Sequence, residues 1–144
     1  MIILPKTLFK RIYEYGYQSY PEECVGALIG SLELNKFTIE DLLPIENNSS
    51  ENRKRRYKVE SRDYLSAEKK ADSLGKTLIG FYHSHPNHPA RPSQTDLDFA
   101  LPNFVYIIVS IKPEHITQIE TIEVGAFVLD YQRSEFVEKT LDIL

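Results

Sequence analysis

One stretch constrains the fold more than any other: a strand that ends in two histidines and is followed, after a proline-rich loop, by a helix start. Residues 77–84 are mostly apolar and lead directly into His83-Ser-His85-Pro. Alternate side chains of a strand point to the same face, so both imidazoles can reach one ion. A loop over residues 86–92 and a short helix over residues 93–101 follow. A His-x-His pair is also common as ordinary polar surface, so the spacing alone leaves two interpretations, a surface pair and a metal site at the strand end.

Neutral imidazole suits zinc, and a carboxylate commonly supplies the third protein ligand of a catalytic zinc site. Asp96 is the nearest candidate, because the loop is long enough to bring it back beside the histidines. Asp98 is a rival, but Asp96 is better placed to face the strand end. The pattern Ser93-x-x-Asp96 is also typical of a helix N-cap, a structural role that can coexist with metal binding. We expect His88, within the loop, to be exposed to solvent.

The rest of the chain mixes strands and helices without a regular alternation, which predicts an α+β or mixed α/β fold in one domain over residues 1–144. Apolar residues at three- and four-residue spacing predict helices over residues 5–18 and 61–75, the second with Ser61 as N-cap and Gly75 at its end. Short apolar or alternating runs predict strands over residues 1–4, 24–30, 36–45, 57–60, 104–111, 115–122, 124–131 and 134–139.

Composition excludes several classes of protein. Lys and Arg number 17 against 21 Asp and Glu, so the net charge of −4 gives no global attraction to nucleic acid or to anionic membranes. The longest apolar runs are far shorter than the roughly 20 residues of a membrane span. No basic segment precedes the four apolar residues at the N-terminus, so we do not expect a signal peptide. Cys24 is the single cysteine, so a buried thiol in a reducing compartment is expected. The sequence therefore predicts a soluble, cytoplasmic protein.

Two separated motifs carry a resemblance to a known family. The string His83-Ser-His-Pro, six residues and then Ser93-x-x-Asp96 resembles the signature of the JAMM metalloproteases, the zinc-dependent members of the MPN-domain family. That family also has Glu-x-x-Gly at the entry to a core strand, and this chain has Glu23-Cys-Val-Gly26 followed by apolar residues and a glycine. The resemblance implies a mixed, largely antiparallel, curved sheet flanked by helices, in a layered arrangement like that of cytidine deaminases.

The resemblance also implies a role for each residue of the motifs. His83, His85 and Asp96 would bind one zinc ion, with water as the fourth ligand. Glu23 would act as the general base, and the Ser93 hydroxyl would help to hold the oxyanion.

The implied reaction is hydrolysis of an amide bond that follows the Gly-Gly tail of a ubiquitin-like protein. The compact chain resembles the prokaryotic branch of the family, whose members occur alongside sulfur-carrier proteins. We therefore expect a ubiquitin-like or sulfur-carrier protein with a C-terminal Gly-Gly as partner, and neither nucleic acid nor membrane. The basic run over residues 53–56 has two interpretations, a surface for an acidic carrier or a solvated loop. The sequence does not determine the oligomeric state.

Other readings of the same residues stay open. A non-catalytic MPN scaffold is one, although such members have lost ligands or the glutamate, and here all five positions are filled. An oxygenase with iron held by two histidines and a carboxylate is another, but it leaves the glutamate and the Ser-x-x-Asp motif unexplained. Glu22 competes with Glu23 as the base. The Glu-x-x-Gly register favours Glu23, and we expect Glu22 to face the opposite side, in solvent.

Overall fold

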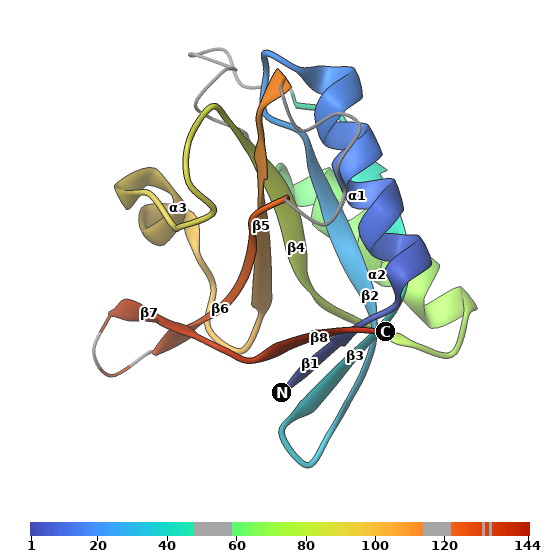
Figure 1. Cartoon of the computed structure of the whole chain (residues 1–144). Coiled ribbons are helices and arrows are strands. Elements are labelled where there is room, and N and C mark those ends of the chain that lie inside the picture. Colours follow the sequence, from blue (N-terminus) through green and yellow to red (C-terminus); the bar gives the residue numbers. More distant parts are fainter. Residues whose placement is uncertain (48–58, 114–121, 131, 133) are drawn as a thin grey trace.

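The computed structural model describes residues 1–47, 59–113, 122–130, 132 and 134–144, and these form an eight-stranded sheet with three helices (Figure 1). In chain order the elements are β1 (Ile2–Leu4), α1 (Lys6–Ser19), β2 (Val25–Glu33), β3 (Lys36–Ile45), α2 (Ser61–Ser73), β4 (Thr77–Pro86), α3 (Gln94–Phe99), β5 (Val105–Ile111), β6 (Val124–Asp130), β7 (Glu135–Glu138) and β8 (Leu141–Ile143).

The sheet has the strand order β7-β6-β5-β4-β2-β3-β1-β8. Four of its seven strand pairs are antiparallel, and three are parallel, namely β4 with β5, β1 with β3 and β1 with β8. The strands twist along the sheet, so that β1 and β8 cross below the lower ends of β4 and β5 in Figure 1. This confirms the mixed, largely antiparallel curved sheet.

Helices α1 and α2 cover opposite faces of the sheet (Figure 1). Tyr82 of β4 packs toward Tyr15 of α1, with ring centroids 6.4 Å apart. Its neighbour Phe81 packs against Tyr64 of α2 at 5.1 Å. Because alternate residues share a face, the histidines that follow Phe81 at even spacing lie on the α2 side of the sheet.

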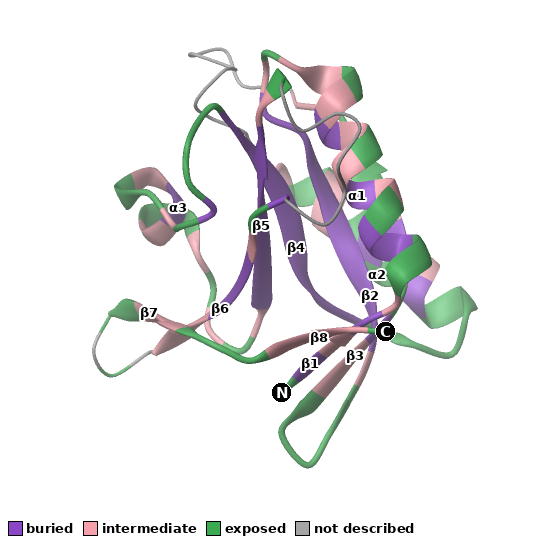
Figure 2. Cartoon of the chain, viewed as in Figure 1, coloured by how far each residue is buried: buried purple, intermediate pink, exposed green. Residues whose placement is uncertain are grey.

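The central strands form the core. Every residue of β5 is buried, and β4 is buried from Leu78 to its end (Figure 2). Such continuous apolar burial is expected where helices cover both faces. The tyrosines of α1 and the residue after it pack against this core and are partly buried. Gly80 lies opposite Val105 in the parallel β4–β5 pair, and a side chain there would meet the Val105 carbonyl.

Several boundaries differ from the predictions. Strand β4 continues to Pro86, two residues past the expected end. Glu60, not Ser61, is the N-cap of α2, because its backbone N–H donates to the Asp63 carboxylate at 2.9 Å. Strand β8 was not predicted: three residues carry too little pattern, and it forms only because β1 offers a parallel edge.

Two predicted strands fall partly or mainly on residues that the structure does not describe. Of residues 57–60 only the last two are described, and they are not in a strand. Of residues 115–122 only Ile122 is described; it is buried and lies just before β6. The basic run over residues 53–56 also lies outside the described residues. Among the described helices, none has the length and apolarity needed to cross a bilayer.

Candidate metal centre

The two histidines lie side by side at the end of β4, as their spacing predicts. His83 pairs with Val25 of β2 on one side and with Ile108 of β5 on the other, which leaves it no exposed surface. The Nε2 atoms of His83 and His85 are 3.2 Å apart. Pairing of His83 on both sides, and of His85 with Ser110 of β5, therefore holds both rings in fixed positions on the α2 face.

Asp96 reaches the same point from the first turn of α3. Its Oδ1 lies 3.2 Å from His83 Nε2, and its Oδ2 lies 3.1 Å from His85 Nε2. The same carboxylate accepts a hydrogen bond from the Ser93 backbone N–H at 2.8 Å, and Ser93 Oγ accepts one from the Asp96 N–H at 3.1 Å. The N-cap and the approach to the histidines thus coexist. Asp98, the rival carboxylate, is exposed and accepts a hydrogen bond from Gln94.

The spacing of these three groups fits a tetrahedral metal ion. With metal–ligand distances of about 2.0–2.1 Å, two ligands of a tetrahedral zinc ion lie about 3.3 Å apart. The three separations between His83, His85 and Asp96 are 3.1 to 3.2 Å. The residues present therefore match the donor set and the size of a zinc site.

The charge states of the three residues also suit a cation. Burial lowers the pKa of His83, which keeps its imidazole neutral and able to bind a metal. Although burial alone would raise it, the two imidazoles and the Ser93 N–H hold the pKa of Asp96 well below its usual range. Burial opposes charge on His85 as well, but hydrogen bonds to Asp96 and to the Pro89 carbonyl raise its pKa overall. Metal binding must then displace any proton on His85.

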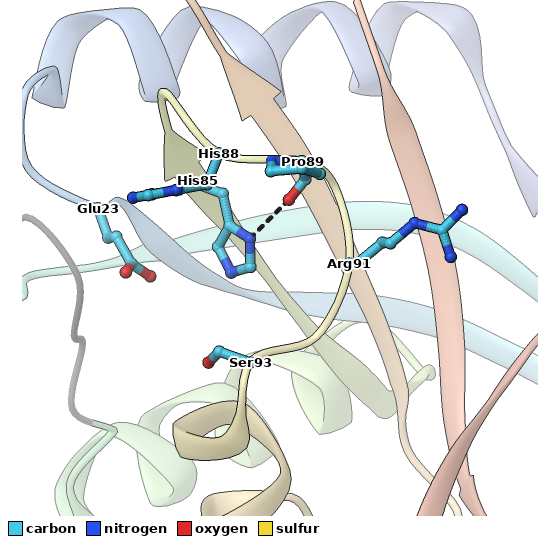
Figure 3. A pocket seen from close by; sticks show the side chains of 6 residues that line it. All are labelled: Glu23, His85, His88, Pro89, Arg91 and Ser93. Carbon is cyan, nitrogen blue, oxygen red and sulfur yellow. Dashed lines mark hydrogen bonds between the residues drawn. The ribbon is translucent and has the colours of Figure 1, made fainter.

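The carbonyl of Pro89 orients the second histidine. His85 Nδ1–H donates to this oxygen at 2.9 Å (Figure 3). When the imidazole is neutral, that bond places its single proton on Nδ1 and leaves the Nε2 lone pair directed at the centre. Sequence reasoning did not identify Pro89 in this role, because a backbone carbonyl leaves no signature in residue type.

Glu23 approaches the centre from the segment that precedes β2. Its carboxylate and the two imidazoles offer ligand atoms that all lie within 4.8 Å of one another. The segment is held because Cys24 N–H donates to Ser84 Oγ at 2.8 Å and Ser84 N–H donates to the Cys24 carbonyl at 3.1 Å. Ser84 lies between the histidines in the chain and faces the opposite side of the sheet. It is a further positioning residue that the sequence reasoning did not single out.

The Glu23 carboxyl group is buried with only 4% of its residue exposed, and its Oε1 has no hydrogen-bond partner among the described residues. Burial, reinforced by the nearby Asp96 charge and opposed by His85, raises the pKa of Glu23 to about 8. A carboxyl group with a pKa near neutrality can both accept and donate a proton at physiological pH.

The remaining candidates do not join the three-residue centre. Glu22 is half-buried, less exposed than expected, and lines a separate cavity on the α1 side of β2. His88 is exposed, as predicted. Cys24 is buried as expected, and burial raises the pKa of its thiol to about 11, so it remains protonated.

A cavity of about 290 Å³ opens over the centre. It is lined by Glu23, His85, His88, Pro89, Arg91 and Ser93 (Figure 3). Glu23, His85 and Ser93 converge on it from three separate segments of the chain. A substrate in this cavity would contact the carboxyl group, the imidazole and the hydroxyl together.

Several known proteins are similar to this chain in sequence. A desampylase from Haloferax volcanii is 34% identical over 91 residues, which cover 62% of this chain and 63% of that protein. A CysO-cysteine peptidase from Mycobacterium tuberculosis is 24% identical over 80% of this chain and 77% of its own length. A probable TtuB-protein conjugate cleaving protease from Thermus thermophilus is 28% identical over 75% of this chain and 69% of its own length.

Solved structures share the fold. The solution structure of a Desulfitobacterium hafniense protein superposes with a TM-score of 0.84 at 25% identity, covering 100% of this chain and 93% of that one. A JAB1/MPN domain protein from Archaeoglobus fulgidus gives 0.61 at 22% identity, covering 100% and 97%, and so supports the fold alone. The family of prokaryotic homologues of the JAB domain matches residues 5–122, so this chain belongs to that family.

Proposed function

We propose that this chain is a zinc-dependent hydrolase of peptide or isopeptide bonds. The observation that carries the proposal is the buried Glu23 carboxyl group beside the His83, His85 and Asp96 centre, with ligand atoms of both histidines within 4.8 Å. A structural metal site needs no such group, whereas hydrolysis needs one that takes a proton from water and returns it to an amine.

His83, His85 and Asp96 would hold the metal. When bound, zinc would polarise the substrate carbonyl and lower the pKa of water to about 7. Glu23 accepts one proton from the attacking water and transfers it to the leaving nitrogen as the C–N bond breaks. The water oxygen ends in the new carboxyl group, whose remaining proton passes to the departing amine, so that the products are a carboxylate and an ammonium group.

Ser93 acts on the developing negative charge. Its Oγ accepts a hydrogen bond from the Asp96 N–H, which leaves the hydroxyl proton available to donate. The side chain also lines the cavity beside His85. A hydroxyl fixed by a helix N-cap is preorganised to donate to the oxyanion that forms from the substrate carbonyl.

The proposed substrate is a ubiquitin-like or sulfur-carrier protein whose C-terminal Gly-Gly is joined to a further group. The names of the similar proteins support this, since one is a desampylase, one a CysO-cysteine peptidase and one a conjugate-cleaving protease. We further propose that the chain acts as a single domain, in the cytoplasm, where its one thiol would remain reduced.

The test is to mix the protein with a C-terminally extended ubiquitin-like carrier from the same genome and to weigh the products. Zinc-loaded protein should release the extension after Gly-Gly, and chelator should abolish the release. The Glu23→Gln variant is the matched control, since it should retain zinc yet not cleave. Tight binding of the carrier without cleavage by the wild type would instead indicate a scaffold.

A further inference from the structure

A second cavity lies on the other side of β2 from the metal centre, on the face of the sheet that α1 covers (Figure 1). Its volume is about 390 Å³, within the range of about 300–1,000 Å³ that is usual for ligand sites. The end of α1, the start of β2 and the end of β3 form its wall. Glu23 lines this cavity as well as the one over the metal centre, so the two cavities are adjacent.

This cavity carries negative charge without a positive counterpart. Glu22 and Glu46 line it in addition to Glu23, and no Lys, Arg or His does so among the described residues. Within the part of the chain that the structure describes, neither Glu22 nor Glu46 forms an ion pair. The two carboxylates therefore attract a cation and repel phosphates and carboxylates.

The arrangement of the carboxylates does not suit a metal ion. A bound Ca²⁺ or Mg²⁺ needs several oxygen ligands that converge on one point. Over the described ranges, one group of three His, Cys, Asp or Glu residues has its ligand atoms within 4.8 Å of one another, and it consists of Glu23, His83 and His85. Because Glu22 and Glu46 do not converge in this way, they suit a larger cation that donates several hydrogen bonds in different directions.

Two tyrosines complete the chemistry of the wall. Tyr15 of α1 and Tyr82 of β4 both line the cavity, with ring centroids 6.4 Å apart and an angle of 51° between the ring planes. Aromatic rings attract ammonium and guanidinium groups that lie over their faces. Carboxylates combined with aromatic rings therefore favour an organic cation over a neutral ligand.

The hydroxyl group of Tyr82 is an independent sign of a ligand. Tyr82 has no exposed surface, and its hydroxyl has no hydrogen-bond partner among the described residues. The end of the ring lies against Gly26, where a Cβ atom would overlap the hydroxyl oxygen. Burial raises the pKa of Tyr82, so the hydroxyl stays neutral. An unpartnered buried hydroxyl is costly, and a ligand in the cavity that Tyr82 lines would supply its partner.

We propose that this cavity binds an organic cation, a primary ammonium or guanidinium group, between the carboxylates of Glu22 and Glu46 and the hydroxyl of Tyr82. The N–H groups of the ligand donate to the two carboxylates and to the Tyr82 oxygen, and its aliphatic part packs beside the ring of Tyr15. A lysine or arginine side chain of a bound protein and a free amine both carry this chemistry. The site goes beyond the proposed function, which uses only residues around the metal centre.

An NMR titration of the zinc-loaded protein tests the site with n-butylammonium, n-butylguanidinium and the neutral n-butanol as probes. Both cations should bind at least about tenfold more tightly than butanol, because they add charge-assisted hydrogen bonds. They should shift the amide signals of Val25 and Ile45, which line the cavity. Equal affinity for the three probes, or shifts confined to other parts of the sheet, would overturn the proposed site.

Variants separate binding from structure. The double change Glu22→Gln and Glu46→Gln should weaken butylammonium binding about tenfold, whereas the exposed Glu68→Gln on α2 makes the same kind of charge change and should leave it intact. Tyr82→Phe should weaken binding about threefold or more yet raise the urea midpoint of the ligand-free protein, because an unpartnered buried hydroxyl is removed. A merely structural hydroxyl would give a lower midpoint. Unchanged affinity in the double variant or in Tyr82→Phe would overturn the site.

A cleavage assay then identifies the source of the cation. It compares two carriers, one extended after Gly-Gly by Ala-Lys and the other by Ala-Gln. A kcat/KM at least about threefold higher for the lysine form, lost in the double variant, would identify a side chain of the substrate. Equal cleavage with butylammonium binding intact would identify a free amine. Failure to cleave either carrier, with that binding intact, would overturn the proposed function and leave the cation site standing.

Discussion

Replacement of Glu23 by glutamine should stabilise the metal-free protein. The same replacement should abolish hydrolysis by the zinc-loaded protein. The pKa of Glu23 is raised from 4.5 to about 8, chiefly by burial. The folded chain therefore favours the protonated carboxyl group, whereas the unfolded chain ionises above pH 4.5. Stability is lost as pH rises between these two values, because unfolding then allows the buried group to ionise.

The magnitude follows from the same two values. A pH of 7 is about 2.5 units above the pKa of 4.5 in the unfolded chain, so the carboxyl group is ionised there, whereas in the folded chain it is still mostly protonated. This difference lowers the unfolding free energy of the wild-type protein by about 3 kcal/mol. Glutamine has the same shape as the protonated acid and does not titrate. The cost at pH 5 is under about 1 kcal/mol, so the gain from Glu23→Gln should grow as pH rises from 5 to 8.

Urea unfolding of both proteins in chelator, at several pH values from 5 to 8, measures this gain. The other titrating groups are common to both proteins, so the difference between the two curves isolates Glu23. Added zinc should reduce the difference, because a nearby cation favours the carboxylate. A difference that stays constant with pH, or a variant that is less stable at pH 7, would refute the burial argument. Full hydrolytic activity in the variant would refute its role as the base.

The remaining predictions concern the ligands, the oxyanion and the sheet. His85→Ala should lower zinc content and activity together, and a normal zinc stoichiometry after dialysis would show that it is not a ligand. Ser93→Ala should slow hydrolysis by a factor on the order of 10²–10³ and, through loss of the N-cap, lower the unfolding free energy by about 1 kcal/mol. An unchanged kcat would exclude the hydroxyl from the oxyanion site. Gly80→Ala should destabilise the protein by about 1–3 kcal/mol in urea, because the new methyl group meets the Val105 carbonyl across the β4–β5 pair. The exposed Lys69→Ala change on α2 is its control, and equal unfolding midpoints for the two would contradict the close approach.

Much of the metal centre could be derived from local spacing. The two-residue spacing on a strand placed His83 and His85 on one face. The Ser-x-x-Asp pattern placed Asp96 in the first turn of a helix. These relations hold because they depend only on the geometry of one strand and one turn. Short elements were less predictable: β8 has three residues, and only the neighbouring edge of β1 makes it a strand.

Glu23 shows the limit of such reasoning. Its role was inferred from the resemblance, because the residues around Glu23 in the sequence do not indicate that it lies close to His83, 60 positions further along the chain. The tertiary structure decides this, through the antiparallel register of β2 with β4 and the bonds between Cys24 and Ser84. The placement of the three proposed ligands, His83, His85 and Asp96, therefore follows from the sequence, because local geometry determines it. The burial of Glu23 depends on the whole sheet, because segments far apart in the chain must pack before that burial exists.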